Sequence, residues 1–352
     1  MIRKKLLYKV FKRAVLLLLL VSAKPLWAQD QHTDPVAENM LVYQRSYGGW
    51  PKAIGNVKVD YNMPISDEQR KEIRATADND DATIDNKATS REIVYLMKAY
   101  SQTKNERYLQ GAKEGIDYIL KAQYENGGWP QYYPNKKIYR GQITYNDDAM
   151  INVLNILFDV ANRSGDYAVL DEAYATKAQE AVTKGIDCIL KTQMTINGKL
   201  TAWGAQYDEK KLVPAKARAF ELPSLASSES ANVVKFLMRI KQPSAAVKNA
   251  IEGAVAWFDE VKIVGYRTDR IDAPSEEKGK DVVLVADPSA TIWARFYDLQ
   301  TMQPQFVGRD SVPKTKLADI DNERRVGYAW YGSWGEKVAK EYPKWKKANG
   351  ID

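Results

Sequence analysis

One phrase occurs twice in this chain at a fixed spacing, and this repeat constrains the fold more than any other feature. The stretch GIDYILKAQ begins at residue 115 and returns as GIDCILKTQ at residue 185, 70 residues later. A fainter third copy begins at Gly253, and the turn sequence GGWP occurs at residue 48 and again at residue 127. Repetition of this kind is typical of folds that stack one supersecondary unit on the next. The sequence therefore predicts a repetitive architecture with aromatic loops.

Each repeat has the pattern of a helix pair. Apolar residues recur at spacings of three and four along two segments, at Ile93, Leu96, Met97 and Tyr100 and at Met150, Val153, Leu154, Leu157 and Phe158. The repeated phrase carries a matching stripe, in which Ile116, Ile119 and Leu120 correspond to Ile186, Ile189 and Leu190. A further helix is predicted with Ser228 as its N-cap and Glu229 in its first turn. Few segments alternate, so the pattern indicates an all-α toroid, open or closed, of helix hairpins.

The first 28 residues have the composition of a secretory signal peptide. Six basic residues precede an apolar run over 14–22, which is too short to cross a bilayer, and small residues follow near Ala28. We therefore expect cleavage near Ala28 and a secreted or periplasmic protein that is not attached to a membrane. Residues 29–35 are predicted to be disordered and residues 36–352 to form a single domain. The segment 262–280 is charged and is predicted to be an irregular surface excursion.

The net charge excludes a general attraction to polyanions. The full chain has a formal charge of +7, but the first 28 residues hold seven Lys or Arg and no acid, so 52 − 7 = 45 basic residues balance 45 acidic ones. A neutral mature chain does not suggest nucleic acid as a partner, and an acidic ligand needs a local cationic cluster. His32 is the only histidine and falls in the predicted disordered segment, which excludes histidine-based catalysis. Cys188 lies in an apolar phrase and is predicted to be core.

Two clusters of acidic and amide residues precede the predicted helices. One is TIDN, which contains Asp85 and Asn86, and the other is YNDD, which contains Asn146 and Asp147. Such residues are typical helix N-caps, and this is one interpretation. The other is a shared site, because helices that start at the same rim of a toroid would bring both clusters together. Two carboxylates with neighbouring amide oxygens would then suit Ca²⁺.

A third segment has the character of a ligand-binding loop. Prolines at both ends of the stretch 214–223 keep it out of a regular helix, which suits the presentation of Lys216 and Arg218 to a ligand. Glu221 is available to form a salt bridge with either cation.

Tryptophans and arginines mark the remaining loops. The tryptophans concerned are Trp50, Trp129 and Trp203 in the repeated loops and Trp330 and Trp334 near the end of the chain. Their rings could carry sugar rings at a cleft or pack between repeats, and the sequence leaves both interpretations open. Arg295 lies among aromatic residues and Arg309 between glycine and aspartate, and arginines can fork onto carboxylates.

Five of these segments together resemble the family 10 pectate lyases. They are TIDN, YNDDAM, PAKARAFELPSLASSES, IWARFY and GYAWYGSW, which occur in the expected order between about residues 40 and 340. The resemblance implies an incomplete (α/α)₃ toroid that cleaves polygalacturonate or pectin by Ca²⁺-dependent β-elimination. We also expect the protein to be a monomer.

The resemblance also implies roles for single residues. Arg218 would be the base that removes the C5 proton, with Lys216 as the reserve candidate, and Asp147 and Asp85 would lie at the Ca²⁺ ion. The substrate contacts are assigned to Asn86, Asn146, Arg295, Arg309 and Trp330. Lys87 departs from the small residue expected after the DN pair. A cleft crowded with cations should lower the pKa of Arg218, which predicts an alkaline optimum.

Two other functions are consistent with the same residues. In a toroid hydrolase, Asp85 and Asp147 would act as the acid and base pair of a glycosidase. A non-catalytic sugar-binding protein would use only the tryptophan loops. Ultraviolet absorbance of the product distinguishes the hydrolase from a lyase, because elimination creates a conjugated double bond and hydrolysis does not.

Overall fold

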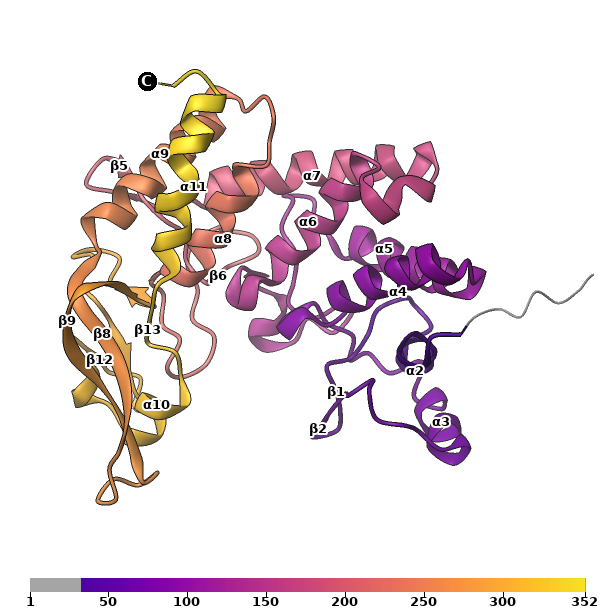
Figure 1. Ribbon diagram of the computed structural model, residues 1–352, viewed down its shortest axis with the longest axis horizontal. Helices are drawn as coiled ribbons and strands as arrows, with labels where there is room; N and C mark the ends of the chain where they lie inside the picture. Colours follow the sequence, from indigo (N-terminus) through magenta and orange to yellow (C-terminus); the bar gives the residue numbers. More distant parts are fainter. Residues whose placement is uncertain (1–32, 352) are drawn as a thin grey trace, which may run out of the picture.

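Helices are the main regular structure of the molecule, as the repeat predicts (Figure 1). The computed structural model describes residues 33–351. Within this range it contains ten α-helices: α2 (Pro35–Tyr43), α3 (Asp67–Arg74), α4 (Ser90–Thr103), α5 (Glu106–Ala122), α6 (Ala149–Ala161), α7 (Glu172–Thr192), α8 (Ser227–Leu237), α9 (Ala245–Glu260), α10 (Asn322–Gly327) and α11 (Trp334–Ala348).

The helices are arranged as three hairpins in two layers. The pairs α4–α5, α6–α7 and α8–α9 each pack within themselves. Helix α6 also contacts both α4 and α8, and α7 contacts both α5 and α9, so successive hairpins lie side by side. Helix α2 packs on the first hairpin and α11 on the last. The expectation of an incomplete helical toroid is confirmed.

The start of the described chain corrects one boundary. The predicted signal peptide and His32 lie outside the described residues. The predicted disordered segment extends too far, because Asp34 caps α2 by accepting the backbone N–H groups of Val36 and Ala37, each at 2.9 Å. Between residues 33 and 351, no helix has the length and apolar character needed to cross a membrane.

The predicted helix stripes form the core. Ile93, Leu96 and Met97 on α4 are buried against Ile116 and Ile119 on α5 in one continuous apolar cluster. The side chain of Cys188 is buried in the same cluster, and burial raises its thiol pKa to about 12. These results confirm that the thiol is a core residue.

A buried tryptophan closes each repeat. In every case the indole N–H donates a hydrogen bond to a backbone carbonyl of the helix that precedes the loop. We call these helices, α2, α5, α7 and α9, the outer helices, and α4, α6 and α8 the inner helices. The four bonds are Trp50 to Met40 (2.7 Å), Trp129 to Ile119 (2.7 Å), Trp203 to Ile189 (2.8 Å) and Trp293 to Phe258 (2.8 Å). Trp50, Trp129 and Trp203 are 0% exposed, so they pack between repeats and offer no face to a sugar.

The fourth of these tryptophans shows where the third repeat is interrupted. The bond from Trp293 spans 35 residues, whereas the bonds from Trp129 and Trp203 span 10 and 14. The extra residues form an antiparallel hairpin of β8 (Ile263–Asp272) and β9 (Lys280–Ala294), which extends away from the helices (Figure 1). The prediction of a surface excursion over 262–280 is confirmed, but the prediction that it is irregular is wrong, because the segment forms a regular hairpin. Most residues of both strands are exposed or partly exposed, which weakens the apolar alternation that marks a strand.

The other strands are two-residue pairings that join loops. They are β1 (Ala53–Ile54), β2 (Val57–Lys58), β3 (Ile143–Thr144), β4 (Thr195–Ile196), β5 (Lys199–Leu200), β6 (Gln206–Tyr207), β7 (Leu225–Ala226), β10 (Phe296–Tyr297), β11 (Phe306–Val307), β12 (Pro313–Lys314) and β13 (Tyr331–Gly332). The β3–β6 and β7–β10 pairs connect the segment before an inner helix to the next tryptophan loop. Strand β13 pairs with β9, which gives a three-stranded sheet in the order β13–β9–β8.

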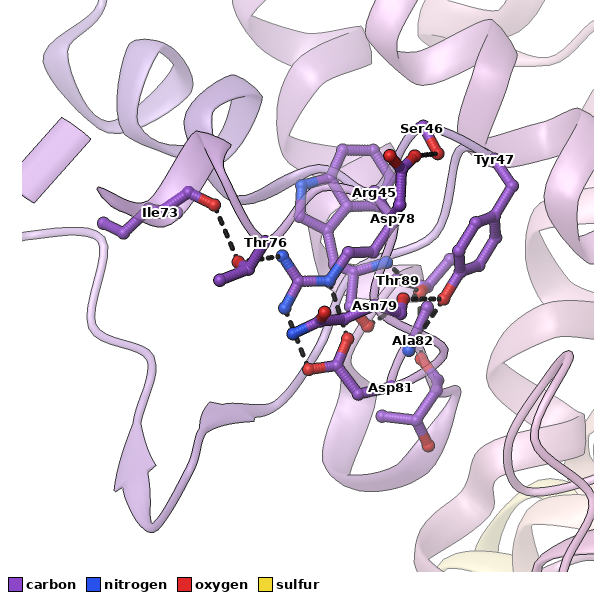
Figure 2. A network of polar contacts seen from close by, with 12 residues as sticks. Arg45, Ser46, Tyr47, Ile73, Thr76, Asp78, Asn79, Asp81, Ala82 and Thr89 are labelled. Atoms are coloured by element: carbon purple, nitrogen blue, oxygen red, sulfur yellow. Dashed lines mark hydrogen bonds and ion pairs between the residues drawn. The ribbon is translucent and has the colours of Figure 1, made fainter. Parts of the chain in front are cut away.

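A buried arginine holds the loop that leads into the first acidic cluster. The Nε and Nη2 atoms of Arg45 lie 2.6 and 2.9 Å from the two carboxylate oxygens of Asp81, and its Nη1 donates to Thr76 Oγ1 at 3.1 Å (Figure 2). Arg45 is 1% exposed, and a charge at such a depth is tolerated only when it is paired. This pairing fixes the segment 76–82 immediately before Asp85.

The first glycine of the GGWP turn offers a test of this packing. Gly127 has a φ of 91°, and a Cβ there would lie 1.9 Å from the carbonyl oxygen of Lys184. We predict that Gly127→Ala lowers the free energy of unfolding in urea by about 3 kcal/mol, because both the turn and α7 would have to shift. Gly198 is the matched control, since its φ is 76° but nothing lies within 4 Å. Gly198→Ala should cost about 1 kcal/mol, and equal losses would contradict the close approach.

Candidate active site

The two acidic clusters form strained turns before the inner helices. They fold as short 3₁₀ segments, η1 (Asp85–Lys87) and η3 (Asn146–Asp148), and no side chain caps α4 or α6. Asn86 has a φ of 50° and Asp147 a φ of 51°, and the residue after each is also left-handed. The N-cap interpretation is therefore wrong. Such conformations cost about 1–3 kcal/mol each and persist where the surroundings impose them, often at functional sites.

Backbone hydrogen bonds place the segments before α4, α6 and α8 in equivalent positions. Each segment donates to the tryptophan carbonyl of one loop and to the carbonyl two residues after the tryptophan of the next loop. The bonds are Thr83 to Trp50 and Ile84 to Gln131, Thr144 to Trp129 and Tyr145 to Ala205, and Ala226 to Trp203 and Ser227 to Arg295. All six measure 2.7 to 3.1 Å. The three segments therefore lie along one edge of the helical layers.

The residue two places after each tryptophan contributes to this edge. At the first loop this residue is Lys52, whose ammonium pairs with Asp85 Oδ2, and at the fourth it is Arg295, which reaches Asp147. Lys52 was not identified as a site residue from the sequence. Its position relative to Trp50 repeats that of Arg295 relative to Trp293, and this repeat offset could have identified it.

The structure brings the two predicted metal ligands together. Segment η1 contacts η3, and the charge of Asp85 acts on Asp147. Burial and the charge of Asp85 raise the pKa of Asp147, whereas Arg295 and Arg218 lower it. Asp85 Oδ1 is buried without a hydrogen-bond partner in the described chain. Two nearby carboxylates with incomplete compensation are therefore available at the edge.

Asn146 orients one of these carboxylates. Its Nδ2 donates to Asp147 Oδ2 at 3.0 Å, and its side chain is almost fully buried. The structure therefore places Asn146 beside Asp147, and its contact with substrate stays a prediction. Asn86, in contrast, is exposed at the same edge.

Arg218 is held by a carboxylate of its own loop. Its Nε donates to Glu221 Oε2 at 2.7 Å, and its guanidinium carbon lies 4.7 Å from the centre of the Phe220 ring. The hydrogen bond and charge of Glu221 raise the pKa of Arg218 despite its partial burial. The expectation that surrounding cations lower this pKa is therefore wrong for the protein without calcium and substrate. Lys216 lies apart from this pair, with its Nζ 3.2 Å from Ser311 Oγ.

Arg309 joins Arg218 beside the same aromatic ring. Its guanidinium lies 5.9 Å from the Phe220 ring centre and pairs with Glu323 at 3.0 and 3.1 Å. A further guanidinium, that of Arg324, lies 4.5 Å from the centre of the same ring. Arg324 was not identified as a site residue from the sequence. The result is a cluster of three arginines around one phenylalanine, in which Arg218 and Arg309 are exposed to solvent and Arg324 is buried.

Trp330 is a packing residue. It is 2% exposed, its indole N–H donates to the carbonyl of Arg324 at 2.9 Å, and its ring lies among Phe296, Phe306 and Tyr328. The prediction that Trp330 contacts substrate is not supported, because the buried ring offers almost no exposed surface. The start of α8 also differs from the prediction. The helix begins at Ser227 without a side-chain cap, although Glu229 does lie in its first turn.

Comparison with known proteins identifies the family. The family model described as pectic acid lyase matches residues 44–339. The chain belongs to the pectic acid lyase family. Among solved structures, the family 10 polysaccharide lyase from Cellvibrio cellulosa is 34% identical with a TM-score of 0.77, and the match covers 88% of this chain and 91% of that chain.

A second structure in this lyase family carries a ligand. It is a mutant of the family 10 polysaccharide lyase from Cellvibrio cellulosa in complex with trigalacturonic acid, at 34% identity and a TM-score of 0.77, with 88% of this chain and 92% of that chain covered. No match was found among curated proteins. The resemblance stated from the sequence motifs is confirmed.

The Lys52 pair provides a test of the edge. We predict that Lys52→Met lowers the free energy of unfolding by about 1–2 kcal/mol, because it leaves the buried Asp85 carboxylate without a counter-charge. Lys58→Met is the control, since Lys58 is exposed and should change stability by less than about 0.5 kcal/mol. Urea unfolding in the presence of a chelator measures both, and identical midpoints would show that Asp85 does not need Lys52.

Proposed function

We propose that this protein is a pectate lyase that cleaves polygalacturonate by β-elimination and releases unsaturated oligogalacturonides. The observation that carries the proposal is the gathering of Asp85, Asp147, Arg218 and Arg295 at one edge. Membership of the pectic acid lyase family supports the reaction class. The complex of the similar Cellvibrio lyase with trigalacturonic acid supports the substrate class.

Calcium fits the donors at this edge. Asp85 Oδ1 is a buried oxygen without a partner, and Asp147 carries a carboxylate that burial and Asp85 disfavour in its charged form. Hard oxygen donors of this kind suit Ca²⁺, and Asp85 and Asp147 would hold it. Between residues 33 and 351 no group of three or more His, Cys, Asp and Glu side chains could hold a metal ion. The remaining ligands would therefore have to be other oxygens, such as amide groups of the chain, water or a substrate carboxylate.

The reaction requires a base and stabilisation of negative charge. The proton at C5 of a galacturonate lies α to a carboxylate, so its removal adds charge to a group that is already anionic. As the base takes this proton, the double bond forms between C4 and C5 and the C4–O bond breaks, and the leaving oxygen then gains a proton. A calcium ion bound beside the carboxylate would supply electrostatic stabilisation of the developing charge. Arg295 would add a fixed cation for the same carboxylate.

Arg218 remains the better of the two candidate bases. It is one of the charges that act on Asp147, whereas the ammonium of Lys216 lies on Ser311. A guanidinium must lose a proton before it can accept one, and its pKa lies above about 12. Glu221 raises the pKa of Arg218 further, so the neutral form becomes more populated only as the pH rises. We therefore expect the rate to increase into the alkaline range.

The direct test is an assay on polygalacturonate. Product is followed by ultraviolet absorbance, with and without a chelator, and after calcium is restored. We expect absorbance to rise, to stop on chelation and to recover with calcium. Reducing ends without absorbance would instead indicate the hydrolase that uses Asp85 and Asp147. Binding without any turnover would indicate a sugar-binding protein.

A pair of variants tests the base. We predict that Arg218→Ala lowers the rate of product formation at least about a hundredfold, the usual contribution of a general base, while binding of polygalacturonate stays detectable. Lys216→Ala is the control and should keep near-normal turnover. Near-normal turnover of Arg218→Ala would end the assignment, and loss of turnover only in Lys216→Ala would transfer the role to Lys216.

A further inference from the structure

A buried glutamate lies directly behind Arg295. Glu229, in the first turn of α8, is 1% exposed, and its Oε1 lies 2.6 Å from Arg295 Nη2. The same Nη2 atom is 3.7 Å from Asp147 Oδ1. A charge-assisted hydrogen bond is typically about 2.7–2.9 Å long, so Arg295 is bonded to Glu229 and is only near Asp147. Arg295 therefore has two carboxylates in reach and is bonded to the one outside the proposed metal site.

Aromatic rings hold the same guanidinium from its face. The guanidinium carbon of Arg295 lies 4.9 Å from the Tyr328 ring centre and 5.7 Å from that of Phe296. The side chain is 11% exposed, and Nε is buried without a hydrogen-bond partner in the described residues. The Glu229 bond and the aromatic contacts thus hold Arg295 in one orientation, while donor capacity remains free.

From this geometry, and resting on the proposed function, we infer that Glu229 is a positioning residue that holds Arg295 away from Asp147. Without the charge of Glu229, Asp147 is the carboxylate within ion-pair distance of Arg295 and would attract it more closely. A close pair would neutralise Asp147 as a metal ligand and would draw Arg295 away from a uronate carboxylate. Glu229 thereby supports both cation binding and substrate binding without touching either.

The chain contains a matched control for this role. Glu92 is also the third residue of an inner helix, here α4, and is also buried beside an arginine. Its Oε1 accepts from Arg91 Nε at 3.0 Å, and Arg91 lies 5.1 Å from the Tyr61 ring centre. Both glutamates have an Oε2 atom without a partner in the described chain. A purely structural contribution of a buried glutamate should therefore be similar at the two positions.

The test compares Glu229→Gln with Glu92→Gln. We expect Glu229→Gln to raise the Kd for Ca²⁺ about tenfold in calorimetry without substrate, as loss of an outer partner of a metal site does. It should also raise KM for polygalacturonate several-fold, while kcat at saturating calcium and substrate changes less than about twofold. Glu92→Gln should leave Kd and KM unchanged at a similar loss of thermal stability. If both variants behave alike in Kd and KM, the inference is wrong.

A double-mutant cycle with Arg295→Gln shows whether Glu229 acts through Arg295. We expect Glu229→Gln to have no further effect on calcium affinity in the Arg295→Gln background, because there is no guanidinium left to position. Additive effects would overturn the inference and assign Glu229 a direct electrostatic role. Should Glu229→Gln fail to fold, Glu229→Asp keeps the charge with a shorter reach and should give an intermediate Kd. Absence of calcium-dependent cleavage in the wild-type protein would instead refute the proposed function.

Discussion

The hydrogen bond from a buried indole to the preceding outer helix is the interaction on which the rest of the structure depends. It recurs at Trp50, Trp129, Trp203 and Trp293, and each time it fixes the loop that follows an outer helix. The carbonyls of these loops then accept the backbone N–H groups of the segments before α4, α6 and α8. A buried N–H or carbonyl without a partner is costly, so these bonds leave little freedom to the loop positions. The edge that carries the candidate site is therefore a product of the repeat itself.

The cations at this edge are paired before any ligand arrives. Lys52 pairs with Asp85, Arg218 with Glu221, Arg295 with Glu229 and Arg309 with Glu323. These four pairs are neutral in sum, as is the chain beyond its first 28 residues. This pairing means that an acidic ligand has to compete with resident carboxylates. The pairs that include a buried carboxylate gain more from their partners than exposed pairs do, since water screens them less.

Sequence reasoning was most successful where a pattern is local or repeated. The stripes through Ile93 and Ile116 were enough to predict helices, because residues three and four apart share a helix face. The hairpin over β8 and β9 was missed because most residues of its strands are exposed or partly exposed and because it interrupts a repeat whose other members are helical. The N-cap interpretation of TIDN and YNDD failed because the same residue types also tolerate left-handed backbone, and composition alone does not separate the two.

The sequence by itself determined the helical repeat, the buried thiol of Cys188 and, through its five motifs, the family. These features depend on residue type and spacing along the chain. Only the tertiary structure decided that Trp330 is buried, that Glu221 raises the pKa of Arg218 and that Lys52 and Glu229 support the edge. Each of these depends on which side chains from distant segments meet, at what distance and with how much water between them. Electrostatic energies vary with separation and burial, and neither quantity can be read from the order of residues.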